Sequence, residues 1–181
     1  MNEQYYDQAN LVDHLQISGL LSRYFRAVDD KCLDLTIVKA TFTTDGRVVR
    51  PNGSALIGWD DILNGQTKSF ARFRATHHVT TDHVIEITGD TAQMRANLTA
   101  MHLWSDAECD PNSLQTHFIA GGVLLVLAKR TVDGWRISEL VNRNTWRSGA
   151  GLSVMAKYER QVQCRCGTDD RGEFAKMSSR S

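Results

Sequence analysis

The chain has 181 residues, of which 41% are hydrophobic and 23% are charged. This composition is typical of one globular domain that is long enough to build a hydrophobic core. Lysine plus arginine and aspartate plus glutamate both number 21. The chain therefore lacks the basic footprint of proteins that bind nucleic acid or anionic lipid, and we expect neither partner.

Two further classes of protein are disfavoured by the sequence. The longest apolar run, Ala120 to Ala128, is too short to span a bilayer, and the N-terminal MNEQYYDQ has no signal-peptide core, so a cytoplasmic protein is expected. The cysteines do not have zinc-site spacing, because Cys32 and Cys109 are isolated and Cys164 and Cys166 have no second pair. No metal or cofactor is predicted.

Apolar residues recur at helical spacing in the first part of the chain. The clearest pattern predicts a helix from about Asn10 to Asp30. A second, short helix over Leu33 to Phe42 is expected to end at a Thr43–Gly46 turn, and a short strand should follow from Gly46 to Arg50. A third helix is predicted from Trp59 to Phe73.

After Ala75 the pattern changes to strands that are separated by turns. Three helices followed by a four-stranded antiparallel meander define an α+β domain. We expect this domain to occupy residues 1–160, and the segment 161–181, rich in Cys, Gly, Ser and charge, to be a disordered tail. The predicted strands are Val79 to Thr88, Thr91 to Trp104, Phe118 to Arg130 and Trp135 to Trp146.

Three segments carry a resemblance to a known family. They are YFRAVDDKCLDL, ATHHVTTDHVIEITGDTAQMRANL and KRTVDGWRISELVNRNTW, and they follow one another in that family's order. From about Leu11 to Arg147 the chain resembles the SnoaL-like branch of the nuclear transport factor 2-like superfamily. The resemblance implies a cone-shaped α+β barrel, with three N-terminal helices packed on a curved antiparallel sheet.

Among enzymes of this group, the chain is most similar to scytalone dehydratase and related polyketide dehydratases and cyclases. Their pattern pairs a carboxylate at the end of the first helix with a histidine at the start of the long strand, and it falls here on Asp29 and His78. The residues partly support this pair, because Asp29 continues the apolar stripe of Leu21 and Phe25, where a carboxylate needs a partner. Asp29 can fix the imidazole tautomer and leave the other ring nitrogen as a general base or acid.

Strand alternation leaves the choice between two neighbouring histidines open. His77 shares a face with apolar residues such as Ile85, whereas His78 shares a face with polar residues. His78 faces the cavity if the polar face lines it, or if a bulge near Thr80–Thr81 shifts the register. We follow the resemblance and choose His78, with His77 in reserve, and we expect His83 to face water.

The chain departs from the dehydratase pattern at three positions. Val28 replaces the tyrosine before the helix-end carboxylate, and Arg50 replaces the tyrosine of the short strand. The second active-site histidine falls near Gly121, and His102 or His117 can replace it from a neighbouring strand. The predicted substrate-binding residues are Tyr24, Trp59, His102, His117 and Asn142.

These features favour a cofactor-independent acid–base enzyme that acts on a small hydrophobic, polyketide-like molecule as a dehydratase, isomerase or cyclase. A homodimer through the outer face of the sheet is also expected. Two alternatives stay open. One is a non-catalytic small-molecule-binding module of the same fold, which the missing tyrosines favour, and the other is the small subunit of a ring-hydroxylating dioxygenase.

Overall fold

The computed structural model describes residues 8–105 and 117–149 of the chain. Within them, three helices pack against one six-stranded sheet whose strand order is β2-β1-β6-β5-β4-β3. The elements in chain order are α1 (Gln8–Asp29), α2 (Leu35–Thr41), β1 (Phe42–Val49), β2 (Ala55–Ile57), α3 (Gly58–Phe70), β3 (Phe73–Thr88), β4 (Thr91–Trp104), β5 (His117–Thr131) and β6 (Gly134–Gly149).

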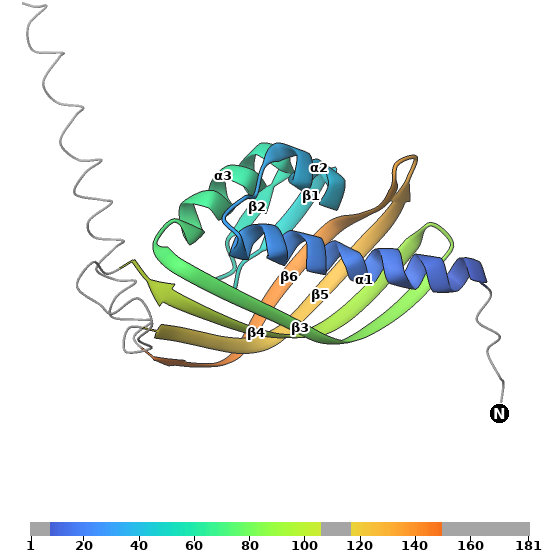
Figure 1. The fold of residues 1–181 in the computed structure, drawn as a ribbon. Coiled ribbons are helices and arrows are strands. Elements are labelled where there is room, and N and C mark those ends of the chain that lie inside the picture. Colours follow the sequence, from blue (N-terminus) through green and yellow to red (C-terminus); the bar gives the residue numbers. More distant parts are fainter. Residues whose placement is uncertain (1–7, 106–116, 150–181) are drawn as a thin grey trace, which may run out of the picture.

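The helices form where the sequence places apolar side chains on one face. In α1, Ile17, Leu21 and Tyr24 follow helical spacing and are buried. Figure 1 shows α1 lying lengthwise along the concave face of the sheet, and it contacts β3 and β6 there. The Asp34 carboxylate accepts a hydrogen bond from the backbone N–H of Ile37 and so caps the start of α2.

The four long strands form the predicted antiparallel meander, β3-β4-β5-β6. β1 extends the meander by pairing in parallel with β6, and β2 pairs antiparallel with β1. The sheet is therefore mixed and six-stranded, not wholly antiparallel. It curves strongly around α1 without closing into a full barrel, and the α+β fold is as predicted (Figure 1).

The predicted turn at Thr43–Gly46 is wrong. These residues lie inside β1, which begins directly after α2. The pairing of β1 with β6 shifts register between Phe42 and Arg47, so the residues that resemble a turn form an irregularity within a strand. The third helix is shorter than predicted, because it ends at Phe70 and Phe73 already belongs to β3.

A bulge in β3 decides which side chains of this strand face the helices. The register of β3 against β4 shifts around Asp82, whose φ is 53°. The bulge reverses the alternation of side chains, so His78 and Ile85 both lie on the inner face. His77 is exposed. The conflict between His78 and the apolar pattern of the strand is thus resolved by a bulge close to the expected position.

The prediction that His83 faces water is wrong. The bulge turns His83 toward α1, where its Nδ1 lies 2.7 Å from Ser18 Oγ and its Nε2 lies 3.1 Å from Thr80 Oγ1. Burial lowers the pKa of His83 below its usual range. The prediction continued the two-residue alternation of side chains past Asp82, but the bulge interrupts the alternation at that point.

Several predictions fall outside the described residues. They concern Cys109, Cys164, Cys166, the proposed tail at 161–181 and the end of the domain at 150–160. No helix among residues 8–105 and 117–149 is long and apolar enough to cross a membrane.

Asp13 links the first half of α1 to the end of β5 and the start of β6. Its carboxylate accepts hydrogen bonds from both Nη atoms of Arg130, at 2.8 and 2.6 Å, and from Trp135 Nε1 at 2.9 Å. The bond from Arg130 is the main reason that the pKa of Asp13 is lowered. Trp135 is only 2% exposed, so its indole N–H depends on this carboxylate.

Asp13→Ala should lower the free energy of unfolding by about 1–3 kcal/mol, because it leaves the buried indole N–H of Trp135 without an acceptor. Urea denaturation followed by tryptophan fluorescence measures the change. Asp90→Ala is the matched control: Asp90 also bonds Arg130, but its side chain is 81% exposed. The control should change stability by less than about 0.5 kcal/mol, and equal losses in both variants would contradict the assignment.

Candidate functional site

The Asp29 carboxylate and the His78 ring meet where the last turn of α1 reaches β3. The Oδ1 atom of Asp29 lies 2.6 Å from Nδ1 of His78. A carboxylate can only accept, so the Nδ1 atom carries the proton and Nε2 keeps its lone pair. The side chain of His78 is 4% exposed and that of Asp29 is 18% exposed. This is the geometry of a buried imidazole that is oriented by a carboxylate.

Two further donors hold Asp29 in place. The Thr76 hydroxyl donates to Oδ1 and the backbone N–H of His78 donates to Oδ2, both at 2.8 Å. Partial burial by itself raises the pKa of Asp29, but the hydrogen bonds from His78 and Thr76 outweigh burial and lower the pKa below its ordinary value. Asp29 is therefore ionised at neutral pH and can accept the hydrogen bond from Nδ1 of His78.

Aromatic rings surround His78 on three sides. Phe25 stacks on it at 4.7 Å between ring centroids with an interplanar angle of 17°. Phe70 and His102 approach it edge to face, at 5.5 and 5.4 Å. Because these rings exclude water, the attraction between Asp29 and a protonated His78 is stronger here than at the surface.

His102 lies on the inner face of β4 beside His78, and it is the predicted replacement for the second histidine. Its Nδ1 lies 3.3 Å from the carbonyl oxygen of Phe118 and donates to it. Burial lowers the pKa of His102 to about 4, and the neighbouring His78 adds to this effect. His102 is thus neutral at neutral pH. Gly121, where the family pattern places this histidine, lies on the outer face under the Trp146 ring.

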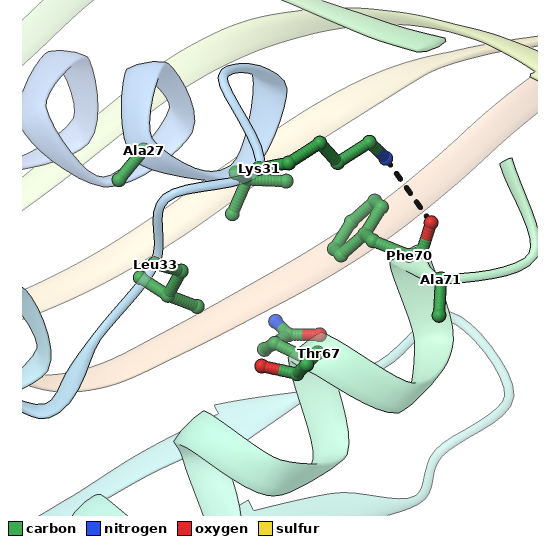
Figure 2. A pocket seen from close by; sticks show the side chains of 8 residues that line it. Ala27, Lys31, Leu33, Thr67, Phe70 and Ala71 are labelled. Carbon is green, nitrogen blue, oxygen red and sulfur yellow. Dashed lines mark hydrogen bonds between the residues drawn. The ribbon is translucent and has the colours of Figure 1, made fainter. Parts of the chain in front are cut away.

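A cavity of about 220 Å³ opens between the end of α1 and the end of α3 (Figure 2). Asp29 and His78 do not line it, and the two regions share Phe70, which forms one wall of the cavity and also contacts the His78 ring. Most of the lining is apolar. The lining residues are Ala27, Val28, Lys31, Leu33, Gln66, Thr67, Phe70 and Ala71.

The other predicted substrate contacts lie at varied distances from the cavity, and their role stays a prediction. Tyr24 is buried behind it, and its hydroxyl accepts a hydrogen bond from the cavity residue Gln66. Trp59 packs at the edge of the core and donates to the backbone oxygen of Phe42. His117 and Asn142 are on β5 and β6.

Asn142 is the more informative of these two. It pairs with the buried Leu124 and therefore faces the inner side of the sheet. Its Oδ1 is buried and has no hydrogen-bond partner within the described residues. His117 begins β5 opposite Leu103, at the end of the sheet. None of the residues that line the cavity was predicted to bind substrate, because helix packing brings together residues such as Lys31, Gln66 and Phe70.

No group of three or more His, Cys, Asp or Glu within residues 8–105 and 117–149 is arranged to hold a metal ion. The Asp29–His78 pair could transfer a proton, and the nearby cavity could bind an apolar molecule.

The SnoaL-like domain family matches residues 9–141. The chain belongs to this family. The protein Kfla4162 from Kribbella flavida has a similar structure, with 27% identity and a TM-score of 0.67, over 76% of this chain and 93% of that one. No curated protein matches this SnoaL-like chain.

Two more distant structures show the same fold. One is a candidate scytalone dehydratase from Novosphingobium aromaticivorans, with 18% identity and a TM-score of 0.67 over 79% of this chain and 91% of that one. The other is a type 2 hexachlorocyclohexane dehydrochlorinase, LinA, with 14% identity and a TM-score of 0.67 over 78% and 92%. At these identities the likeness concerns the fold alone.

The low pKa of His102 predicts how stability depends on pH. A histidine whose pKa is about 4 when folded and 6.5 when unfolded binds a proton more readily in the unfolded chain. The free energy of unfolding should therefore fall as the pH drops from about 6.5 to 4, by up to about 3 kcal/mol from this residue.

Denaturant unfolding of the wild type and of His102→Phe at several pH values measures this contribution. The variant should show a shallower loss over the same range, with a remainder from His83, whose pKa is also lowered. Identical pH profiles for the two proteins would rule out a neutral, buried His102. The NMR titration of the His102 ring gives its pKa directly.

Proposed function

We propose that this SnoaL-like protein is a cofactor-independent acid–base enzyme, a dehydratase, isomerase or cyclase, acting on a small apolar molecule. The observation that carries the proposal is the 2.6 Å contact between Asp29 Oδ1 and His78 Nδ1 at a site where the His78 side chain is 4% exposed. An ionised carboxylate bound to a buried imidazole is a common way to prepare a general base.

In the proposed mechanism, Nε2 of His78 takes a proton from a carbon or oxygen atom of the substrate. The imidazolium that forms keeps its Nδ1 bond to Asp29, so the new positive charge is balanced without moving a heavy atom. The same Nε2 then returns the proton to a leaving group or to another carbon. In an elimination the bond from carbon to the leaving group breaks and the leaving group carries away the returned proton, whereas in an isomerisation the proton returns to another carbon and no group is lost.

The surroundings of the pair support this chemistry in two ways. Neutral His102 adds no positive charge next to the imidazolium. Phe70 contacts both the His78 ring and the cavity, so a rotation of its side chain would connect a bound molecule with His78. The names of the dehydratase and dehydrochlorinase of the same fold, which both describe eliminations, agree with this class of reaction.

His78→Gln and Asp29→Asn should each reduce turnover by about 10²–10⁴-fold, because the base is removed in one and loses its orienting charge in the other. An assay that does not need the natural substrate is the exchange of the α-protons of 1-tetralone and similar apolar ketones in D₂O, followed by ¹H NMR. His77→Gln is the matched control, since His77 is exposed on the other face of β3. Wild-type rates in His78→Gln, with folding confirmed by circular dichroism, would refute the mechanism.

A second candidate function is a small-molecule-binding module without catalysis. The observation that favours it is Val28, which lines the cavity where the dehydratase pattern has a tyrosine, so the hydroxyl of that pattern is missing from this wall. A binding module would be stabilised by apolar ligands and give no exchange or product, whereas the enzyme would show both.

We further propose that two copies of the chain pair through the outer face of the sheet. Apolar residues on this face are exposed on three different strands, among them Val79 at 41%, Leu127 at 44% and Trp146 at 52%. Val79 and Trp146 share one row across the strands, with Gly121 between them. Covering such a surface with a second copy removes apolar area from water.

Val79→Lys combined with Leu127→Lys should convert a dimer into a monomer, because two charges would be buried in an apolar contact. Light scattering coupled to gel filtration measures the mass. The control, Val132→Lys, adds a charge at an exposed position in the β5–β6 turn and should leave the mass unchanged. A monomeric wild type would contradict the proposed dimer.

A further inference from the structure

Lys31 occupies a backbone position that usually belongs to glycine. Its φ is 57°, two residues after the end of α1. Its N–H donates to the Val28 oxygen at 3.3 Å, and the N–H of Cys32 donates to the Ala27 oxygen at 2.9 Å. This is the hydrogen-bond pattern of a Schellman cap, in which glycine adopts the left-handed conformation at the lowest cost. Backbone stability alone therefore gives no reason for a lysine here.

The lysine side chain instead extends along the cavity toward the end of α3. Its Nζ donates to the backbone oxygen of Phe70 at 3.1 Å and lies 6.0 Å from the centroid of the Phe70 ring (Figure 2). The residue as a whole is exposed, but this end of it is partly desolvated. Only one of the three ammonium donors is used by Phe70, so others remain for a molecule in the cavity.

The ammonium group is also close enough to interact electrostatically with Asp29 and His102. Burial lowers the pKa of Lys31, and the negative charge of Asp29 partly opposes this effect. Lys31 in turn contributes to the lowered pKa of His102. These two effects place Lys31 within electrostatic reach of Asp29 and His102, on the cavity side of Phe70.

We propose that Lys31 binds an anionic oxygen of the substrate, so that this enzyme acts on small apolar carboxylates. The inference rests on the proposed acid–base function and names its substrate class. The apolar body of the molecule would lie against Val28, Leu33 and Phe70. Its carboxylate would accept hydrogen bonds from the ammonium group, whose positive charge offsets the repulsion by Asp29.

The test compares two ligands of nearly the same shape, 2-naphthoate and 2-naphthamide, by isothermal titration calorimetry at pH 7. The wild type should bind the carboxylate roughly tenfold more tightly than the amide, as expected for charge-assisted hydrogen bonds. Lys31→Met and Lys31→Gly should bind both ligands equally. Lys68→Met, which removes an exposed lysine from the last turn of α3, should keep the preference.

Lys31→Gly guards against a folding artefact, because glycine relieves the left-handed backbone and should leave the melting temperature equal or higher. A preference that persists in both Lys31 variants, or a wild type that shows none or binds neither ligand, would overturn the proposal. His78→Gln should keep the preference while losing proton exchange. If His78→Gln keeps full exchange, the acid–base function fails, whereas binding that still depends on Lys31 leaves the carboxylate subsite in place.

Discussion

The bulge at Asp82 is the constraint on which the arrangement of this protein depends. An unbroken β3 would direct either His78 or the apolar Ile85 toward α1, but not both, because side chains alternate along a strand. The bulge brings both inward. Asp82 adopts a left-handed φ of 53°, and its carboxylate accepts a hydrogen bond from Asn97 of β4 at 2.6 Å. One irregular residue thus lets a single strand supply the core at one end and the polar site at the other.

The second determinant is the way in which α1 ends. A carboxylate in the last turn of a helix is opposed by the helix dipole, so Asp29 needs donors from elsewhere, and β3 supplies them through Thr76 and His78. Two residues later, the left-handed cap directs Lys31 toward α3 and away from this pair. Both charged groups are therefore positioned by the backbone geometry of one helix terminus.

The sequence predicted those parts of the site that follow a regular period. Asp29 lies on the apolar stripe of α1, and His102 alternates with the buried Ala100 on β4, so each could be assigned to the inner face. His78 could be chosen only from the resemblance, because the bulge that turns it inward has no strong sequence signal. The same break in period led to the wrong placement of His83.

Lys31 and Phe70 were missed for other reasons. A left-handed helix cap is recognised in a sequence by glycine or asparagine, and a lysine at that position conceals it. Phe70 falls within the predicted third helix, but its contact with both His78 and the cavity depends on how α3 packs against α1. Such a position follows from tertiary structure, not from local periodicity.

The charges around His78 also suggest why an anionic substrate suits this site. Asp29 places a negative charge on one side of Phe70, and the Lys31 ammonium lies on the other side, along the cavity. An anion bound at Lys31 would be paired with that ammonium group, so the apolar body of the molecule could approach His78 without an unpaired charge. Neutral His102 and the rings of Phe25 and Phe70 keep the local dielectric low, which makes these charge interactions stronger than they would be in water.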